Sequence, residues 1–286
     1  MEFITDCLNM FNSPFMRQAL LAGLFASIAC GMAGTLVIHN HLTFLAGGAS
    51  HAAYGGIGLA LFFSLPVLPC ALLFSLGASL LMGAISLRGK ERGASMTDTS
   101  SPDAAIGVLW AAGMAFGIIL IELTPGYAGE LMGFLFGSIL TVPREDLVAM
   151  GIFVAALPLV LAYFRQGIWA LSLDRDFART RGLPVNALYL LLIGITAVTV
   201  VMLIRIVGLI LVLALLTIPP YLARSKHRSL EATMALASVY AFGFCLAGLA
   251  LSWHTDISSG AAIIAVASVV YFLAQVPQLR PARTLP

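Results

Sequence analysis

The sequence predicts an all-α, polytopic membrane protein, and three observations lead to this fold class. Hydrophobic residues make up 60% of the 286 residues and charged residues only 10%, whereas soluble domains carry about 25% charged residues. The mean hydropathy is +1.00. The apolar residues fall in runs of about 20, the length that a helix needs to cross the hydrocarbon core of a bilayer. We expect a single transmembrane domain across residues 1–286.

Nine apolar runs are long enough, or nearly so, to span a membrane. They lie at about 17–38, 44–63, 67–87, 104–122, 146–164, 185–203, 206–222, 233–252 and 259–276. Residues 130–142 are also apolar but too short to span, and we interpret them as a short re-entrant or interfacial helix. An eight-span arrangement results if the first run is peripheral, so the prediction is 8–9 transmembrane helices.

The basic residues predict how the chain is oriented in the membrane. If the N-terminus is outside, the inner loops hold 12 of the 15 Lys and Arg residues. These are Arg88, Lys90, Arg92, Arg165, Arg175, Arg179, Arg181, Arg224, Lys226, Arg228, Arg280 and Arg283. Because cytoplasmic loops are enriched in Lys and Arg, this distribution predicts an external N-terminus and a cytoplasmic C-terminus.

The second apolar run carries one ionisable side chain, His51, in a stretch of glycine and alanine. At helical spacing Gly47, His51 and Gly55 share one stripe, and Gly48 and Gly56 lie on the next, so neighbouring helices can approach closely. An ionisable group at membrane depth is costly and therefore marks a candidate functional residue. The alternative is a neutral histidine that is hydrogen-bonded to a carbonyl of the next helix.

The inner segment 172–184 predicts a short helix outside the apolar runs. Ser172 is the expected cap, Gly182 the expected end, and Pro184 prevents continuation. Leu173 and Phe177 are four residues apart and form a small apolar face on an otherwise charged helix. The segment is either a helix that lies on the membrane surface or a docking site for a cytoplasmic partner, with Phe177 as the anchor.

Pro219 and Pro220 lie at the inner end of the run 206–222. Proline removes a backbone hydrogen bond, so this pair predicts a bend near the inner mouth of a pore. Simple termination of the helix at this point is the alternative.

Seven motifs in this order resemble the permease subunit of bacterial ABC importers for zinc, manganese or iron. They are Gly-Gly-Ala-Ser-His-Ala at 47–52, Asp-Ala-Ala-Ile-Gly at 103–107, Leu-Phe-Gly-Ser-Ile-Leu at 135–140, Asp-x-Asp-Phe-Ala-x-x-x-Gly at 174–182, Val-Gly-Leu-Ile-Leu at 207–211, Leu-Leu-Thr-Ile-Pro at 215–219 and Asp-Ile-Ser-Ser-Gly at 256–260. The resemblance extends from about residue 17 to residue 275.

The resemblance implies a homodimer in the bacterial inner membrane, with two cytoplasmic ATPase subunits and an extracytoplasmic metal-binding protein as partners. The chain has no Gly-x-x-x-x-Gly-Lys-Ser/Thr loop, so we expect a transport subunit and not an enzyme. The metal ion is its cargo, and we expect no permanently bound cofactor and no nucleic-acid partner. Zinc is the favoured cargo because an undiscriminating site binds zinc more tightly than manganese, with manganese or iron as alternatives.

The resemblance also implies roles for particular residues. His51 belongs to the metal pathway, and Glu130 aligns with an acidic position of the family. Glu122 and Asp256 are further candidate donors, because most other acids lie in inner loops or at the N-terminal tail, although each can equally be a solvated charge at a helix end. The coupling residues are Asp174, Asp176, Phe177, Ala178 and Gly182. One departure is Gly47, because many relatives carry an aspartate at this position.

Two other classes of transporter remain open. A related ABC permease for chelated iron or cobalamin would share the architecture but have a less ionisable pathway. A secondary metal transporter would need no ATPase, but it would normally show interrupted helices in a repeat, which we do not find in the sequence.

Overall fold

The computed structural model describes residues 14–91, 102–125, 139, 142–226 and 229–275. The described residues form helices and no strands, in agreement with the predicted all-α class. The helices are α2 (Pro14–His39), α3 (Thr43–Phe62), α4 (Val67–Glu91), α5 (Pro102–Glu122), α7 (Arg144–Tyr163), α8 (Arg165–Leu173), α9 (Arg175–Thr180), α10 (Val185–Val207), α11 (Leu209–Arg224), α12 (Leu230–Thr255) and α13 (Ser259–Gln275).

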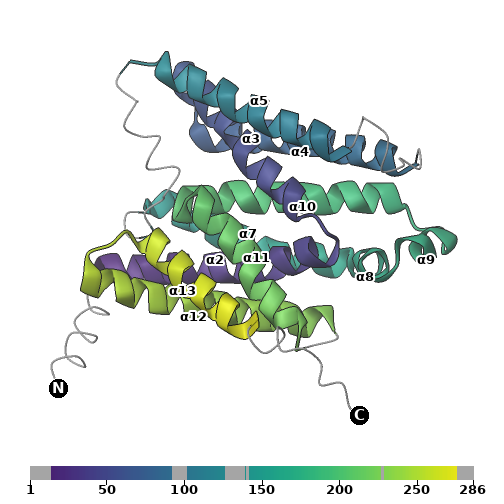
Figure 1. Ribbon diagram of the computed structural model, residues 1–286. Helices are drawn as coiled ribbons and strands as arrows, with labels where there is room; N and C mark the ends of the chain where they lie inside the picture. The colour runs from purple at the N-terminus through teal and green to yellow at the C-terminus, as the bar shows by residue number, and fades with distance from the viewer. Residues whose placement is uncertain (1–13, 92–101, 126–138, 140–141, 227–228, 276–286) are drawn as a thin grey trace, which may run out of the picture.

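The helices form two groups that are joined by α10 (Figure 1). In the first group α3, α4 and α5 pack against one another. In the second group α2, α11, α12 and α13 do the same. Helix α10 contacts α3 and α4 on one side and α2 and α11 on the other. A displacement of α10 would therefore change its contacts with both groups.

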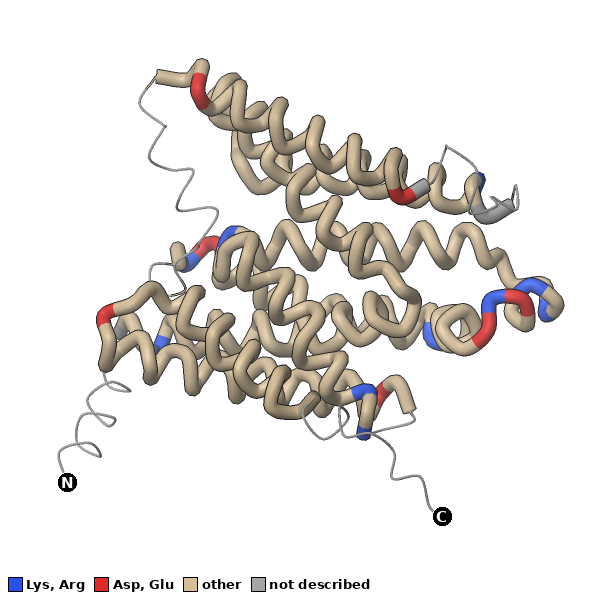
Figure 2. Tube along the Cα trace, in the orientation of Figure 1, with Lys and Arg blue, Asp and Glu red and all other residues tan. Residues whose placement is uncertain are grey.

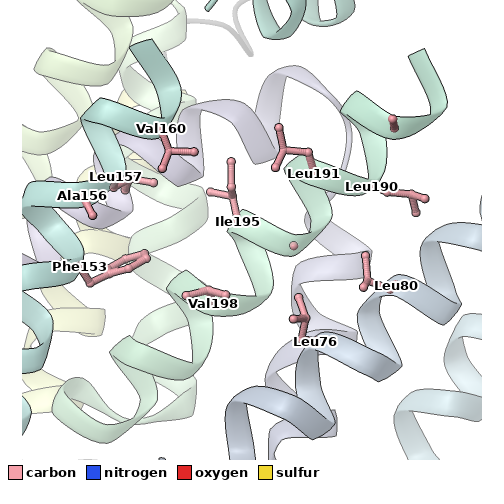
Figure 3. Close-up of a pocket in the computed structure, with 12 residues that line it drawn as sticks. Leu76, Leu80, Phe153, Ala156, Leu157, Val160, Leu190, Leu191, Ile195 and Val198 are labelled. Carbon is pink, nitrogen blue, oxygen red and sulfur yellow. The ribbon is translucent and has the colours of Figure 1, made fainter. Parts of the chain in front are cut away.

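The charged residues lie near the ends of the helices, and the middle of the bundle is almost free of them (Figure 2). Six helices are long and apolar enough to cross a membrane, namely α2, α4, α5, α7, α10 and α12. Helices α11 and α13 are shorter apolar helices. Each of the nine predicted apolar runs thus corresponds to one described helix, and six of these helices meet the criteria for a span by length and composition.

The boundary between the sixth and seventh runs differs from the prediction. Helix α10 continues through Arg205 to Val207, and the break comes at Gly208, where φ is +81°. Side chains with a Cβ avoid such a backbone conformation, so the glycine decides where one helix ends and the next begins. Hydropathy does not contain this signal, because the apolar residues continue on both sides.

Helix α3 lies very close to its two neighbours at particular glycines. A Cβ atom on Gly56 would lie 2.5 Å from the carbonyl oxygen of Cys70 in α4. A Cβ atom on Gly58 would lie 2.5 Å from the carbonyl oxygen of Gly117 in α5. Gly48 and Gly55 face the side chains of Met82 and Phe74 at similarly short distances. In contrast, a Cβ on Gly47 would make only ordinary van der Waals contact, 3.8 Å from the Trp110 ring.

A partly buried ion pair fastens the start of α7 to the end of α10. Both Nε and Nη2 of Arg205 donate to Oδ2 of Asp146, at 3.1 and 2.7 Å. The two side chains are only 25% and 12% exposed. Removal of one partner from such a pair leaves the other charge poorly solvated, which makes the loss costly.

We therefore expect Asp146→Ala to destabilise the folded chain by about 2–3 kcal/mol, a little below the cost for a fully buried pair. The measurement is the thermal unfolding midpoint of the purified chain in detergent. Glu231→Ala is the matched control, because the Arg165–Glu231 pair has the same 2.7 Å separation but is 64% and 47% exposed. Exposed pairs contribute about 0–1 kcal/mol, so equal shifts for the two variants would contradict the prediction.

Candidate metal pathway and coupling segment

The His51 side chain projects from the middle of α3 and is half-buried against α5. Its Nδ1 atom lies 3.2 Å from Sδ of Met114. Its ring lies 4.5 Å from the Trp110 ring, with 31° between the two planes. Trp110 and Met114 are four residues apart on α5 and therefore share a face of that helix. We call these three residues the His51 cluster.

The His51 cluster lies at the surface of the α3–α5 group and not in the interior of the chain. The same face of α5 forms a shallow apolar hollow of about 410 Å³. It is lined by Gly107, Trp110, Ala111, Met114, Ala115 and Ile118. Since this surface is open, a closed path for an ion along it would need a second wall.

The two predicted acidic donors that the structure describes do not join His51. Glu122 is the last residue of α5, eight residues beyond Met114, which is about 12 Å along the helix axis. Asp256 is exposed at the C-terminal end of α12, in the other group of helices. Glu130 lies outside the described residues. Within the described ranges, the structure brings no three His, Cys, Asp or Glu side chains together in a group that could hold a metal ion.

The inner segment consists of two helices, α8 and α9, instead of one short helix. The predicted cap Ser172 is wrong, because this residue lies inside α8 and its Oγ accepts a hydrogen bond from Nδ2 of Asn40 at 2.9 Å. The cap is Asp174, whose side chain accepts from the backbone N–H groups of Asp176 and Phe177 at 2.8 and 3.1 Å. A carboxylate is a strong N-cap acceptor, and its negative charge also favours the start of the helix.

The α8–α9 segment presents two large apolar side chains outward. Leu173 is 79% exposed and Phe177 is 50% exposed, while Ala178, the next residue of α9, is buried. Gly182 ends the turn after α9 with φ of +75°. Figure 1 shows α9 at one extreme edge of the bundle. The segment therefore has the exposure that a docking helix requires.

Comparison with known proteins identifies the family. Residues 12–278 match the ABC 3 transport family over nearly the whole chain. The chain belongs to the ABC 3 transport family. An uncharacterized membrane protein of Synechocystis sp., slr2045, is 44% identical over 91% of this chain and 89% of its own. The manganese transport system membrane protein MntC of Halalkalibacterium halodurans is 29% identical over 93% of this chain and 88% of its own.

A solved structure supports the same assignment. PsaBC from Streptococcus pneumoniae, determined in complex with Fab, superimposes with a TM-score of 0.82 at 26% identity. The match covers 96% of this chain and 94% of the other. As a member of the ABC 3 transport family, this chain is a membrane component of a metal transport system and not an enzyme.

The sequence did not predict that Trp110 and Met114 accompany the histidine of this ABC 3 family member. The two residues have helical spacing, so the sequence contains the signal that they share a face. It contains no signal for which helix that face contacts, because α3 and α5 are separated by α4 in the chain.

The two prolines of this ABC 3 family member do not end their helix. Pro219 and Pro220 are buried inside α11, which continues to Arg224, so the interpretation as a helix terminus is wrong. The carbonyl oxygen of Leu216 loses its partner to Pro220, and it lies against Gly34 of α2. A Cβ at Gly34 would be 2.5 Å from that oxygen, so the glycine allows α2 to cover the freed carbonyl.

Proposed function

We propose that this chain is the permease subunit of an ATP-driven importer of divalent metal ions in the bacterial inner membrane. The observation that carries the proposal is the half-buried His51 beside Met114, at an open surface within the apolar part of the bundle. An imidazole at membrane depth binds first-row metal ions, and a single weak site suits an ion that must leave again.

In this proposal the metal pathway forms between two copies of the chain. One copy supplies a histidine, a thioether and an open hollow on α5, but no acidic partner among the described residues of this cluster. A second copy placed against the same face would close the hollow and supply a second histidine. A homodimer with a twofold axis at this surface is consistent with how most soluble oligomers assemble.

We further propose that α3, α11 and α13 cross the membrane together with the six long apolar helices. Helix α3 has 20 residues, enough for a span, although it is not among the six helices that meet both criteria of length and composition. With all nine helices crossing and the N-terminus outside, α8 and α9 face the cytoplasm. Segment 130–142 remains a predicted re-entrant helix that lies outside the described residues, except for Ile139 and Val142.

We assign the two proposed partners, an ATPase subunit and a binding protein, to opposite ends of the bundle. The exposed Leu173 and Phe177 would dock onto a cytoplasmic ATPase subunit, which supplies the energy. An extracytoplasmic binding protein would deliver the ion at the opposite end. Glu122 and Asp256 both lie at helix ends there and are exposed, so they suit an entrance for cations better than a binding site inside the membrane.

Two cargo ions have support from different observations. The name of the H. halodurans relative favours manganese. The thioether of Met114 beside His51, without a carboxylate, favours a softer ion such as zinc, because Mn²⁺ prefers oxygen ligands. The ligand preference of ferrous iron is intermediate between those of manganese and zinc.

The test is uptake of radiolabelled manganese, zinc and iron by cells with the gene deleted and by the same cells with it restored. We expect deletion to abolish uptake of one free cation and restoration to recover it. Loss of chelated iron or cobalamin uptake alone would instead identify a chelate permease. Recovery of uptake in vesicles that contain the chain without an ATPase would identify a secondary transporter.

A further inference from the structure

Arg175 of α9 is held against the transmembrane part of the chain. Its guanidinium carbon lies 4.5 Å from the centre of the Tyr189 ring, in the first turns of α10. Its Nε and Nη2 atoms are buried and have no hydrogen-bond partner among the residues that the structure describes. Because these two nitrogens are buried without such partners, the aromatic face of Tyr189 is the contact that compensates the charge there.

Tyr189 carries the connection onward to α4. Its side chain is buried, and its hydroxyl lies 3.2 Å from Oγ of Ser86. The three residues therefore link α9 to α10 and α10 to α4. Helix α4 packs directly against α3, which carries His51.

Helix α8 also packs on α10, where the Leu188 side chain lies against Gly167, and two polar contacts tie the segment to the other group of helices. Ser172 of α8 accepts a hydrogen bond from Asn40, which follows α2. Arg165 of α8 forms an ion pair with Glu231 of α12. Arg175 is the cation–π contact by which α9 itself reaches α10 and, through Tyr189 and Ser86, the α3–α5 group.

We propose that Arg175 is a positioning residue that couples movement of α9 to α10 and α4 during transport. The proposal rests on the proposed function, in which an ATPase subunit moves α9. Phe177 binds that subunit on the outer face of α9, and Arg175 transmits the displacement on the inner face. Without Arg175 the ATPase still docks and hydrolyses ATP, but its movement reaches the metal pathway less effectively.

The experiment uses the complete complex of the chain with its ATPase subunit, reconstituted in lipid vesicles with the binding protein outside. Three quantities are measured for each variant: retention of the ATPase subunit, ATP hydrolysis, and uptake of the cation that the natural complex transports. Arg175→Ala is expected to retain the ATPase subunit and to lower the number of ions imported per ATP by at least about tenfold, the scale of losing one buried cation–π contact. Arg179→Ala, an exposed arginine on the same helix, is the matched control and keeps the natural ratio.

Variants of Tyr189 test the same contact from α10, in case Arg175→Ala does not accumulate in the membrane. Tyr189→Leu removes the aromatic face and is expected to lower the ratio as Arg175→Ala does, whereas Tyr189→Phe keeps the face and most of the ratio. Combining Arg175→Ala with Tyr189→Leu should add nothing, because both remove one contact.

Two results would overturn the proposal. The first is an unchanged ratio of ions to ATP in Arg175→Ala. The second is a loss of ATPase retention that accounts for the whole loss of uptake, which would make Arg175 a docking residue. Failure of the proposed function is a separate result, since the natural complex itself would then import no cation.

Discussion

Cells that carry His51→Ala in place of the natural chain are expected to lose at least about 90% of cation uptake, a tenfold effect typical of weakened metal coordination. The substitution removes the imidazole, which is the strongest metal donor in the His51 cluster. Alanine leaves space beside Trp110 and Met114, but the glycine-mediated contacts of α3 with α4 and α5 do not involve the imidazole. We therefore expect the variant to accumulate in the membrane and to retain its ATPase subunit.

His39→Ala is the matched control for this substitution. His39 is also half-buried, but its Nδ1 atom is 2.9 Å from the carbonyl oxygen of Thr35, one turn earlier in the same helix. It has no place in the His51 cluster, so its loss should leave uptake within about twofold, as expected for a local hydrogen bond. Full uptake in His51→Ala would make this histidine a packing residue, and the proposed pathway would have to be abandoned.

Met114→Leu addresses the choice of ion in the same assay. If the thioether contributes to coordination, leucine should lower zinc uptake more than manganese uptake, because manganese gains little from sulfur. An equal reduction for both ions would indicate that Met114 acts only through its shape.

Each apolar run found in the sequence corresponds to a helix among the described residues, because the requirement to satisfy every backbone group within lipid leaves the helix as the solution for an apolar run of this length. Helix ends were less well predicted where local polar groups compete. Asp174 rather than Ser172 caps α9, since both residue types are good caps and the choice depends on where α8 stops. The break at Gly208 was missed for a different reason, because the apolar residues continue on both sides of the glycine.

The environment of His51 was only half predicted. Its own importance follows from the cost of an ionisable group at membrane depth. The neighbours of His51 depend on the rotation of α5 about its axis and on the close approach of α3 and α5 that Gly58 and Gly117 allow. Neither feature can be predicted from one stretch of the sequence. The contact of Arg175 with Tyr189 is of the same kind, because it joins two helices across a turn.

Phe177→Ala is expected to release the ATPase subunit from the complex. Phe177 is 50% exposed on α9, and a buried aromatic anchor at an interface contributes roughly 2–4 kcal/mol. The fold of α9 should survive, because its cap at Asp174 and its end at Gly182 do not involve the phenyl ring. The measurement is the dissociation constant of the purified chain for its ATPase subunit, which should rise about 30- to 1,000-fold.

Tyr163→Ala is the control that isolates this effect. Tyr163 is 83% exposed at the end of α7, close in sequence to α8 but outside the α8–α9 segment. If exposure of an aromatic ring were sufficient for docking, both variants would bind the ATPase more weakly, whereas the proposed role of α9 requires a loss in Phe177→Ala alone. Variants of Phe177 and Arg175 then distinguish two steps on α9, namely binding of the ATPase subunit and transmission of its movement. Loss of Phe177 should abolish binding and hydrolysis-driven transport together, while loss of Arg175 should leave the ATPase bound and active but disconnected from His51.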